Sequence, residues 1–287
     1  MNLKQTYADY SRLLSKRALL FPQLYRYSRA LREFLARKRL SNPGRLREQE
    51  EKGFAALCQE GYAPAETLVD AEMREELVAA CDALQALAVN APRRKNKQFF
   101  SSLMPEDLAA DSILVRFALQ ENILQLVASY FKESPYLYNV DLLASYGGDG
   151  TKWDQSQLWH QDTADAKVLK LWVYISDVLD AEHGPFSYLP ANYSRKLPNP
   201  FHRRVSDAQI RELGYEDKAV PVLGPRKTAF LIDTRNCYHL GSRVLGQNVR
   251  VAYVATYFSF ATLSPNNSIR PANQILSPIQ QLALMRG

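Results

Sequence analysis

The chain has 287 residues, of which 46% are hydrophobic and 23% charged, a composition typical of a globular protein with one large domain. No apolar run reaches about 18 residues and the start of the chain has no signal-peptide core, so neither a transmembrane helix nor export is expected. Three widely spaced cysteines without a C-x-x-C pair argue against disulfides and a thiolate zinc site, which fits a cytoplasmic protein.

The net charge of +6 is concentrated in residues 1–50, which carry twelve Lys/Arg and four Asp/Glu, whereas residues 51–287 carry a net charge of −2. A helix is predicted from Pro22 onward, because one face gathers apolar side chains and the rest is basic. The apolar residues are Leu24, Tyr27, Leu31, Phe34 and Leu35. Ser41-Asn42-Pro43-Gly44 ends this helix.

Two interpretations of residues 1–44 remain open. The apolar stripe can pack on the main domain, with the charges in solvent. Alternatively, the segment is a basic amphipathic helix that contacts an anionic membrane or polyanion, which would place the protein at the inner face of a membrane. No helix-turn-helix, zinc finger or RNA-binding signature occurs, so nucleic acid is not expected as a partner.

Helices are also predicted between residues 51 and 130. Asp70 can cap a helix whose apolar face carries Met73, Leu77, Cys81 and Leu84. A basic connection follows at residues 92–97, and residues 119–130 have the apolar spacing of an amphipathic helix.

Beyond residue 135 the segments become short, β-branched and aromatic, which predicts strands separated by turns. In the segment 168–176, Leu169, Leu171 and Val173 share one face, and Lys170, Trp172 and Tyr174 share the face expected to point into a barrel. Helices followed by many short strands indicate an α+β fold with a β-sandwich or jelly-roll core. The predicted strands are Tyr136–Tyr146, Val168–Ser176, Pro185–Leu189, Val220–Leu223, Lys227–Ile232 and Val249–Phe260.

The candidate metal ligands are His160, Asp162 and His239. In an extended segment residues i and i+2 project from the same face, so His160 and Asp162 can converge on one ion. Two imidazoles and one carboxylate form the facial triad that leaves open positions on Fe(II). An H-x-D triplet alone is weak evidence, because in a chain with four histidines it arises by chance in roughly one sequence in five.

Arg250 strengthens this interpretation. It follows His239 by eleven residues on a predicted strand and shares a face with Ala252, Val254 and Thr256. An arginine among small apolar residues is expected to be buried, and a buried guanidinium needs an anionic partner. The carboxylate of a 2-oxoacid would supply one through a bidentate pair.

These motifs resemble the phytanoyl-CoA dioxygenase-type branch of the Fe(II)/2-oxoglutarate oxygenases over roughly residues 50–260. The resemblance implies a double-stranded β-helix (jelly-roll) core with supporting N-terminal helices. The matching segments are Trp159–Asp162, Leu171–Asp177, His183–Pro190, Asp233–Gly241 and Arg250.

The resemblance also assigns roles to single residues. It implies that His160, Asp162 and His239 bind iron and that Arg250 holds the distal carboxylate of 2-oxoglutarate. Gln161 and Trp172 match positions that approach this cosubstrate, and the candidate substrate contacts are Lys170, Tyr174, His202 and Arg203.

The sequence departs from the family pattern at His183, where Asn is common, and at Ala191-Asn192, where Gly-Ser-His is common. His183 is interpreted as a turn residue and not as a fourth ligand. Similar halogenases replace the ligand carboxylate by a small residue, so the presence of Asp162 favours hydroxylation.

The expected activity is therefore O2-dependent hydroxylation of an aliphatic C–H bond, with release of succinate and CO2. A small-molecule, lipid-linked or sugar substrate fits the sequence equally well. Two alternatives remain: a non-catalytic jelly-roll binding module for a glycan or lipid headgroup, and a zinc hydrolase that uses the same triad but gives no role to Arg250.

Overall fold

The computed structural model describes residues 45–88, 99–101, 103, 105–197, 204–241, 243–260, 262, 268–270 and 275–284. The basic helix predicted within residues 1–44, the connection at 92–97 and the candidate substrate residues His202 and Arg203 lie outside these ranges. Within them, no helix combines the length and apolar character that crossing a membrane requires.

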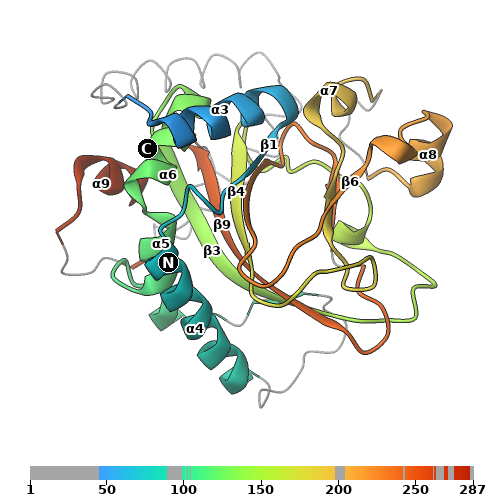
Figure 1. Cartoon of the computed structure of the whole chain (residues 1–287), viewed down its shortest axis with the longest axis horizontal. Helices are drawn as coiled ribbons and strands as arrows, with labels where there is room; N and C mark the ends of the chain where they lie inside the picture. Colours follow the sequence, from blue (N-terminus) through green and yellow to red (C-terminus); the bar gives the residue numbers. More distant parts are fainter. Residues whose placement is uncertain are drawn as a thin grey trace, which may run out of the picture.

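The helices α3 (Glu48–Glu60), α4 (Ala71–Ala88), α5 (Ile113–Ala118), α6 (Glu121–Phe131) and α9 (Pro278–Leu284) form one layer of the molecule. The predicted cap of α4 is confirmed, because a side-chain oxygen of Asp70 accepts a hydrogen bond from the backbone N–H of Met73 at 2.8 Å. The amphipathic helix predicted at 119–130 is α6, and its apolar residues are buried. The short helix α7 (Ala191–Ser194) lies beside one end of α3, and α8 (Asp207–Glu212) lies on the opposite side of the molecule from α9 (Figure 1).

A six-stranded antiparallel sheet has the order β1-β7-β4-β9-β3-β2, and a three-stranded sheet has the order β6-β5-β8. Each predicted strand is confirmed, with ends shifted by a few residues. Three short strands were not predicted. The strands are β1 (Tyr62–Pro64), β2 (Phe99–Ser101), β3 (Pro135–Tyr146), β4 (Val168–Tyr174), β5 (Phe186–Tyr188), β6 (Val220–Val222), β7 (Ala229–Asp233), β8 (His239–Leu240) and β9 (Val249–Ser259).

The large sheet is buried on both faces, which explains why its central strands are nearly continuous apolar runs. Its outer face packs on the helices through residues such as Leu171 and Tyr253. Its inner face packs on the small sheet through Trp172, Tyr174 and Phe230. The predicted alternation along residues 168–174 is thus confirmed, and two facing antiparallel sheets form a jelly roll (Figure 1).

Candidate metal centre

The candidate metal centre lies where the segment 160–162 pairs with the segment 234–239. The backbone N–H of His160 donates to the carbonyl of His239, and the N–H of His239 donates to the carbonyl of His160, both at 2.9 Å. The N–H of Asp162 donates to the carbonyl of Thr234 at 2.8 Å. His239 also belongs to β8, which pairs with β5. Residues 79 positions apart in the sequence are therefore fixed relative to each other by main-chain hydrogen bonds.

The side chains of His160, Asp162 and His239 converge, as predicted. One ligand atom of each residue lies within 4.8 Å of the others. The Nε2 atom of His239 is 3.9 Å from Oδ2 of Asp162, and the two imidazole ring centroids are 4.3 Å apart. Donors that each lie about 2 Å from one ion are about 3 Å apart when they occupy neighbouring positions, so a small inward movement of these side chains would bring all three onto one metal.

The backbone also selects the imidazole nitrogens that face the centre. Nδ1 of His160 lies 2.8 Å from the carbonyl oxygen of Leu158, and Nδ1 of His239 lies 3.1 Å from that of Cys237. A carbonyl only accepts, so each Nδ1 carries the proton and donates. Each Nε2 then presents its lone pair to the centre, as a metal-ligating histidine does.

The charges around the centre favour its metal-binding protonation state. Burial lowers the pKa of His239 to about 3, with His160 adding to the shift, and burial also lowers the pKa of His160. Burial opposes ionisation of Asp162, but Lys170, whose Nζ is 2.7 Å from Oδ2, and His239 together bring its pKa below the ordinary value. At neutral pH the centre therefore offers two neutral imidazoles and a carboxylate.

The metal-free protein is expected to lose stability as the pH falls below 6.5, the ordinary value for histidine. The folded-state pKa of His239 is depressed, so between pH 6.5 and about 3 the unfolded chain binds a proton that the folded chain excludes. The loss between pH 6.5 and 5 is on the order of 1–2 kcal/mol. Urea unfolding in chelator at pH 7 and pH 5 measures it, and His239→Gln should show a shallower dependence. An equal dependence in both proteins would contradict the assignment.

Arg250 lies on the inner face of β9 and is 1% exposed. Its Nη1 donates a hydrogen bond to the carbonyl of Gly184 at 2.6 Å, and its Cζ lies 5.8 Å from the ring centroid of Trp172. Gly241 is adjacent, and a Cβ there would lie 3.5 Å from both terminal nitrogens. The predicted burial of this guanidinium is confirmed, and the glycine keeps side-chain atoms away from its end.

The other predicted residues take different positions. Nε2 of Gln161 donates to the carbonyl of Asn236 at 3.2 Å. Trp172 is buried, and its indole nitrogen has no hydrogen-bond partner among the described residues. Tyr174 is fully buried, and its hydroxyl donates to the carbonyl of Val222 and accepts from the N–H of Phe186. That hydroxyl joins the two sheets, so a substrate contact by Tyr174 stays a prediction.

Two contacts at this site were not predicted from the sequence: the ion pair of Lys170 with Asp162 and the hydrogen bond from Arg250 to the turn that follows His183. Lys170 was predicted to face the barrel, but no partner was predicted for it. His183 occupies a turn, as predicted, with Nδ1 2.9 Å from Oδ1 of Asp180. The carbonyl of the adjacent Gly184 is the acceptor for Arg250, which makes this turn part of the arginine site.

No protein-family model and no curated protein matches the chain. Solved structures do match. EctD from S. alaskensis with bound Fe has a TM-score of 0.54 at 16% identity, covering 82% of this chain and 86% of EctD. AviO1 from Streptomyces viridochromogenes Tue57 has a TM-score of 0.51 at 15% identity, covering 76% and 98% of the two chains.

The epimerase SnoN, in complex with Fe3+, alpha ketoglutarate and nogalamycin RO, has a TM-score of 0.50 at 19% identity, covering 73% of this chain and 83% of SnoN. At such identities the likeness concerns the fold. Together with the two packed antiparallel sheets, it shows that this chain has an α+β fold with a double-stranded β-helix (jelly-roll) core.

Proposed function

We propose that the chain is an Fe(II)- and 2-oxoglutarate-dependent oxygenase. One observation carries the proposal: two imidazoles and one carboxylate converge within 4.8 Å inside a jelly roll. This donor set is the facial triad of non-haem Fe(II) oxygenases. Two structures of similar fold, EctD and SnoN, are described with bound iron, and the SnoN structure also contains alpha ketoglutarate.

The residues present fit the metal. Both histidines direct Nε2 toward the centre because their Nδ1 atoms donate to carbonyls, and Asp162 is held as a carboxylate beside Lys170. Three ligands leave positions open for a chelating cosubstrate and dioxygen. Nitrogen and oxygen donors without a thiolate suit Fe(II), although they do not by themselves exclude Zn(II).

The residues also fit a dicarboxylate cosubstrate. Arg250 provides a buried cation beside Gly241, and Trp172 provides a buried indole N–H that no described residue accepts. In the proposed complex, Arg250 binds the distal carboxylate of 2-oxoglutarate, and Gln161 and Trp172 flank the cosubstrate. Bound Fe(II) and 2-oxoglutarate would supply oxidation by O2, with release of succinate and CO2.

The chain's own residues orient the reactants and limit the access of water. Trp172, Phe186 and Phe230 form an apolar wall next to His239, whose ring centroid is 5.4 Å from that of Phe186. This wall keeps the arginine side of the centre in a low-dielectric environment, which strengthens a guanidinium–carboxylate pair. Lys170 is partly exposed and forms an ion pair with the carboxylate of Asp162, which holds this carboxylate in position.

Within this class we propose hydroxylation of an aliphatic C–H bond, as in the phytanoyl-CoA dioxygenase-like proteins that the sequence resembles. The presence of Asp162 favours hydroxylation over halogenation. SnoN, which is an epimerase, indicates that a protein of this fold can support another outcome. A small-molecule, lipid-linked or sugar substrate is proposed, with residues 1–44 as a candidate membrane contact and Lys170, Tyr174, His202 and Arg203 as candidate substrate contacts.

Succinate formation from 2-oxoglutarate tests the proposed class. We expect slow turnover without added substrate that requires both Fe(II) and O2, stops when Zn(II) replaces iron, and falls by at least about 100-fold in His160→Ala. Mass spectrometry of succinate provides the measurement. Wild-type protein that retains iron but forms no succinate in the presence of O2 would contradict the proposed class, and wild-type protein that neither retains iron nor forms succinate would favour a binding module.

A further inference from the structure

The segment Asp233–Cys237, called here the metal loop, connects β7 to β8 and contacts two candidate ligands and the residue between His160 and Asp162 through its main chain. The carbonyl of Thr234 accepts from the N–H of Asp162, and the carbonyl of Cys237 accepts from Nδ1 of His239. A third carbonyl of the loop, that of Asn236, accepts a hydrogen bond from the side-chain amide of Gln161. The conformation of this loop therefore determines the orientation of the His239 ring and the position of Asp162.

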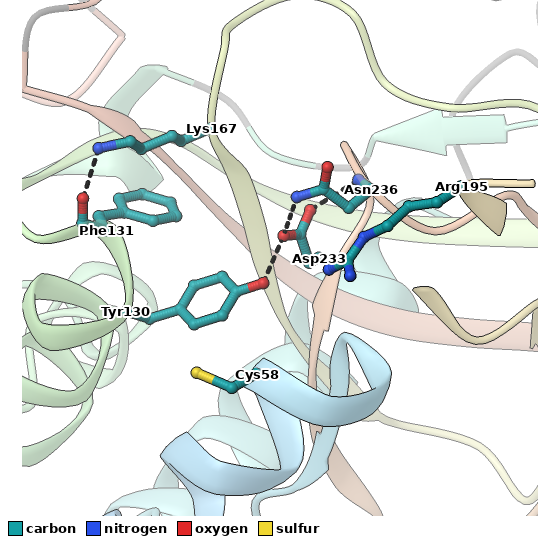
Figure 2. Close-up of a pocket in the computed structure, with 7 residues that line it drawn as sticks. All are labelled: Cys58, Tyr130, Phe131, Lys167, Arg195, Asp233 and Asn236. Carbon is teal, nitrogen blue, oxygen red and sulfur yellow. Dashed lines mark hydrogen bonds between the residues drawn. The ribbon is translucent and has the colours of Figure 1, made fainter. Parts of the chain in front are cut away.

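Asp233 determines the shape of the metal loop. One carboxylate oxygen accepts from the backbone N–H groups of Arg235 at 3.0 Å and Asn236 at 2.8 Å. The other accepts from the side-chain amide of Asn236 at 2.7 Å and from the hydroxyl of Tyr130 at 2.6 Å. Figure 2 shows the last two groups meeting the carboxylate from two sides. The aspartate itself is 3% exposed, whereas Asn236 is exposed, so these four bonds are partly shielded from competing water.

Tyr130 ties the metal loop to the helical layer. It belongs to α6, and its hydroxyl reaches Asp233 across 103 positions of sequence. The phenol and Asp233 line a cavity of about 290 Å³ that also contacts Cys58 of α3 (Figure 2). Because Tyr130 borders a cavity, its hydroxyl can be removed without forcing neighbouring side chains to repack.

We propose that Asp233 and Tyr130 are positioning residues of the metal centre, an inference that rests on the proposed metal site. Neither side chain belongs to the ligand set, and both act through the metal loop. Groups that orient metal ligands typically contribute about 10- to 100-fold in metal affinity. Since these two act through the backbone, values at or below the lower end are expected: about tenfold for Asp233→Asn and a few-fold for Tyr130→Phe.

The two variants remove different parts of the network. Asp233→Asn places an amide N–H₂ where the carboxylate now accepts two side-chain donors, so the hydroxyl of Tyr130 and the side-chain amide of Asn236 must reorient to accept, which disturbs the loop. Tyr130→Phe removes a single hydroxyl and leaves the bonds within the loop in place. A graded loss of metal affinity is therefore expected, larger for the aspartate.

The matched control is Tyr257→Phe. Tyr257 is a fully buried tyrosine on β9 whose hydroxyl donates to the carbonyl of Ala118 at 2.8 Å, on the helical side of the sheet. Like Tyr130, it joins a strand of the large sheet to the helical layer. Its hydroxyl contacts α5 and not the metal loop, so its loss should lower the melting temperature without changing metal affinity.

Co(II) alone serves as the probe, titrated into the full chain against a competing chelator while its visible ligand-field absorption is recorded. The prediction is weaker Co(II) binding and an altered absorption spectrum in Asp233→Asn and Tyr130→Phe, with both properties unchanged in Tyr257→Phe. Thermal melting without metal shows that each variant is folded. If Asp233→Asn does not fold, the Co(II) affinity and the absorption spectrum of Tyr130→Phe test the inference.

Wild-type affinity and spectrum in the folded variants would overturn the inference while leaving the proposed function intact. Equal weakening in Tyr257→Phe would also overturn it, because the effect would then follow general stability. Wild-type protein that binds no Co(II) would overturn the proposed metal site and this inference together.

Discussion

Replacing His239 by alanine is expected to weaken Fe(II) binding by more than about 100-fold, beyond the usual effect of losing an orienting group around a metal. His239 supplies a neutral Nε2 from a buried ring that a backbone carbonyl already orients. Its removal leaves one imidazole and one carboxylate, which are too few protein ligands for a facial triad. Anaerobic calorimetric titration with Fe(II) measures the loss.

His183→Ala is the matched control for this prediction. His183 is also a histidine next to a short strand, but its ring contacts Asp180 in a turn and stays outside the cluster of His160, Asp162 and His239. Its removal should leave Fe(II) affinity within about twofold, since no metal ligand or orienting group changes. A comparable loss in both variants, or Fe(II) affinity preserved in His239→Ala, would refute the ligand assignment.

Replacing Arg250 by methionine is expected to weaken 2-oxoglutarate binding to the Fe(II)-loaded protein by roughly 30-fold or more. Removing one partner of a buried, hydrogen-bonded charge pair costs about 2–5 kcal/mol, and methionine keeps much of the stem volume. Arg250→Lys should recover only part of the affinity, because an ammonium group cannot form the bidentate pair. Isothermal titration under argon gives both values, and Fe(II) affinity should not change.

Arg226→Met controls for the loss of one positive charge. Arg226 is partly exposed and forms an ion pair with Asp82 of α4, on the helical side of the sheet. This variant should bind 2-oxoglutarate as the wild-type protein does. Equal affinities in Arg250→Met and wild type would remove the proposed cosubstrate site, and equal weakening in Arg226→Met would reduce it to a general charge effect.

The strands of the jelly roll could be predicted because burial imposes alternation on them. Leu169, Leu171 and Val173 pack on the helices, while Trp172 and Tyr174 pack on the small sheet. Strands of two or three residues could not be predicted, because their pairing depends on the partner strand. β1 exists because residues 62–64 pair with residues 230–232 of β7, and so few residues carry no periodic pattern.

The convergence of the candidate ligands could be predicted, because His160 and Asp162 project from the same face of one extended segment and His239 precedes a strand with a buried arginine. The contact of Lys170 with Asp162 could not, because it depends on how the segment that carries Asp162 folds against β4. Asp233 carried a usable signal, since an aspartate at the end of a buried strand readily forms a turn with the next N–H groups. Its bond to Tyr130 joins distant parts of the chain and carried no such signal.

The most direct test of the proposed metal and cosubstrate site is visible absorption of the protein with Fe(II) and 2-oxoglutarate under strict exclusion of oxygen. A 2-oxoacid that chelates Fe(II) gives a metal-to-ligand charge-transfer band, and the proposal predicts one iron per chain. The band should require both additions, weaken in Arg250→Met and be absent in His239→Ala. A wild-type protein without the band, or one whose band persists in His239→Ala, would contradict the assignment of Fe(II) and 2-oxoglutarate to this centre.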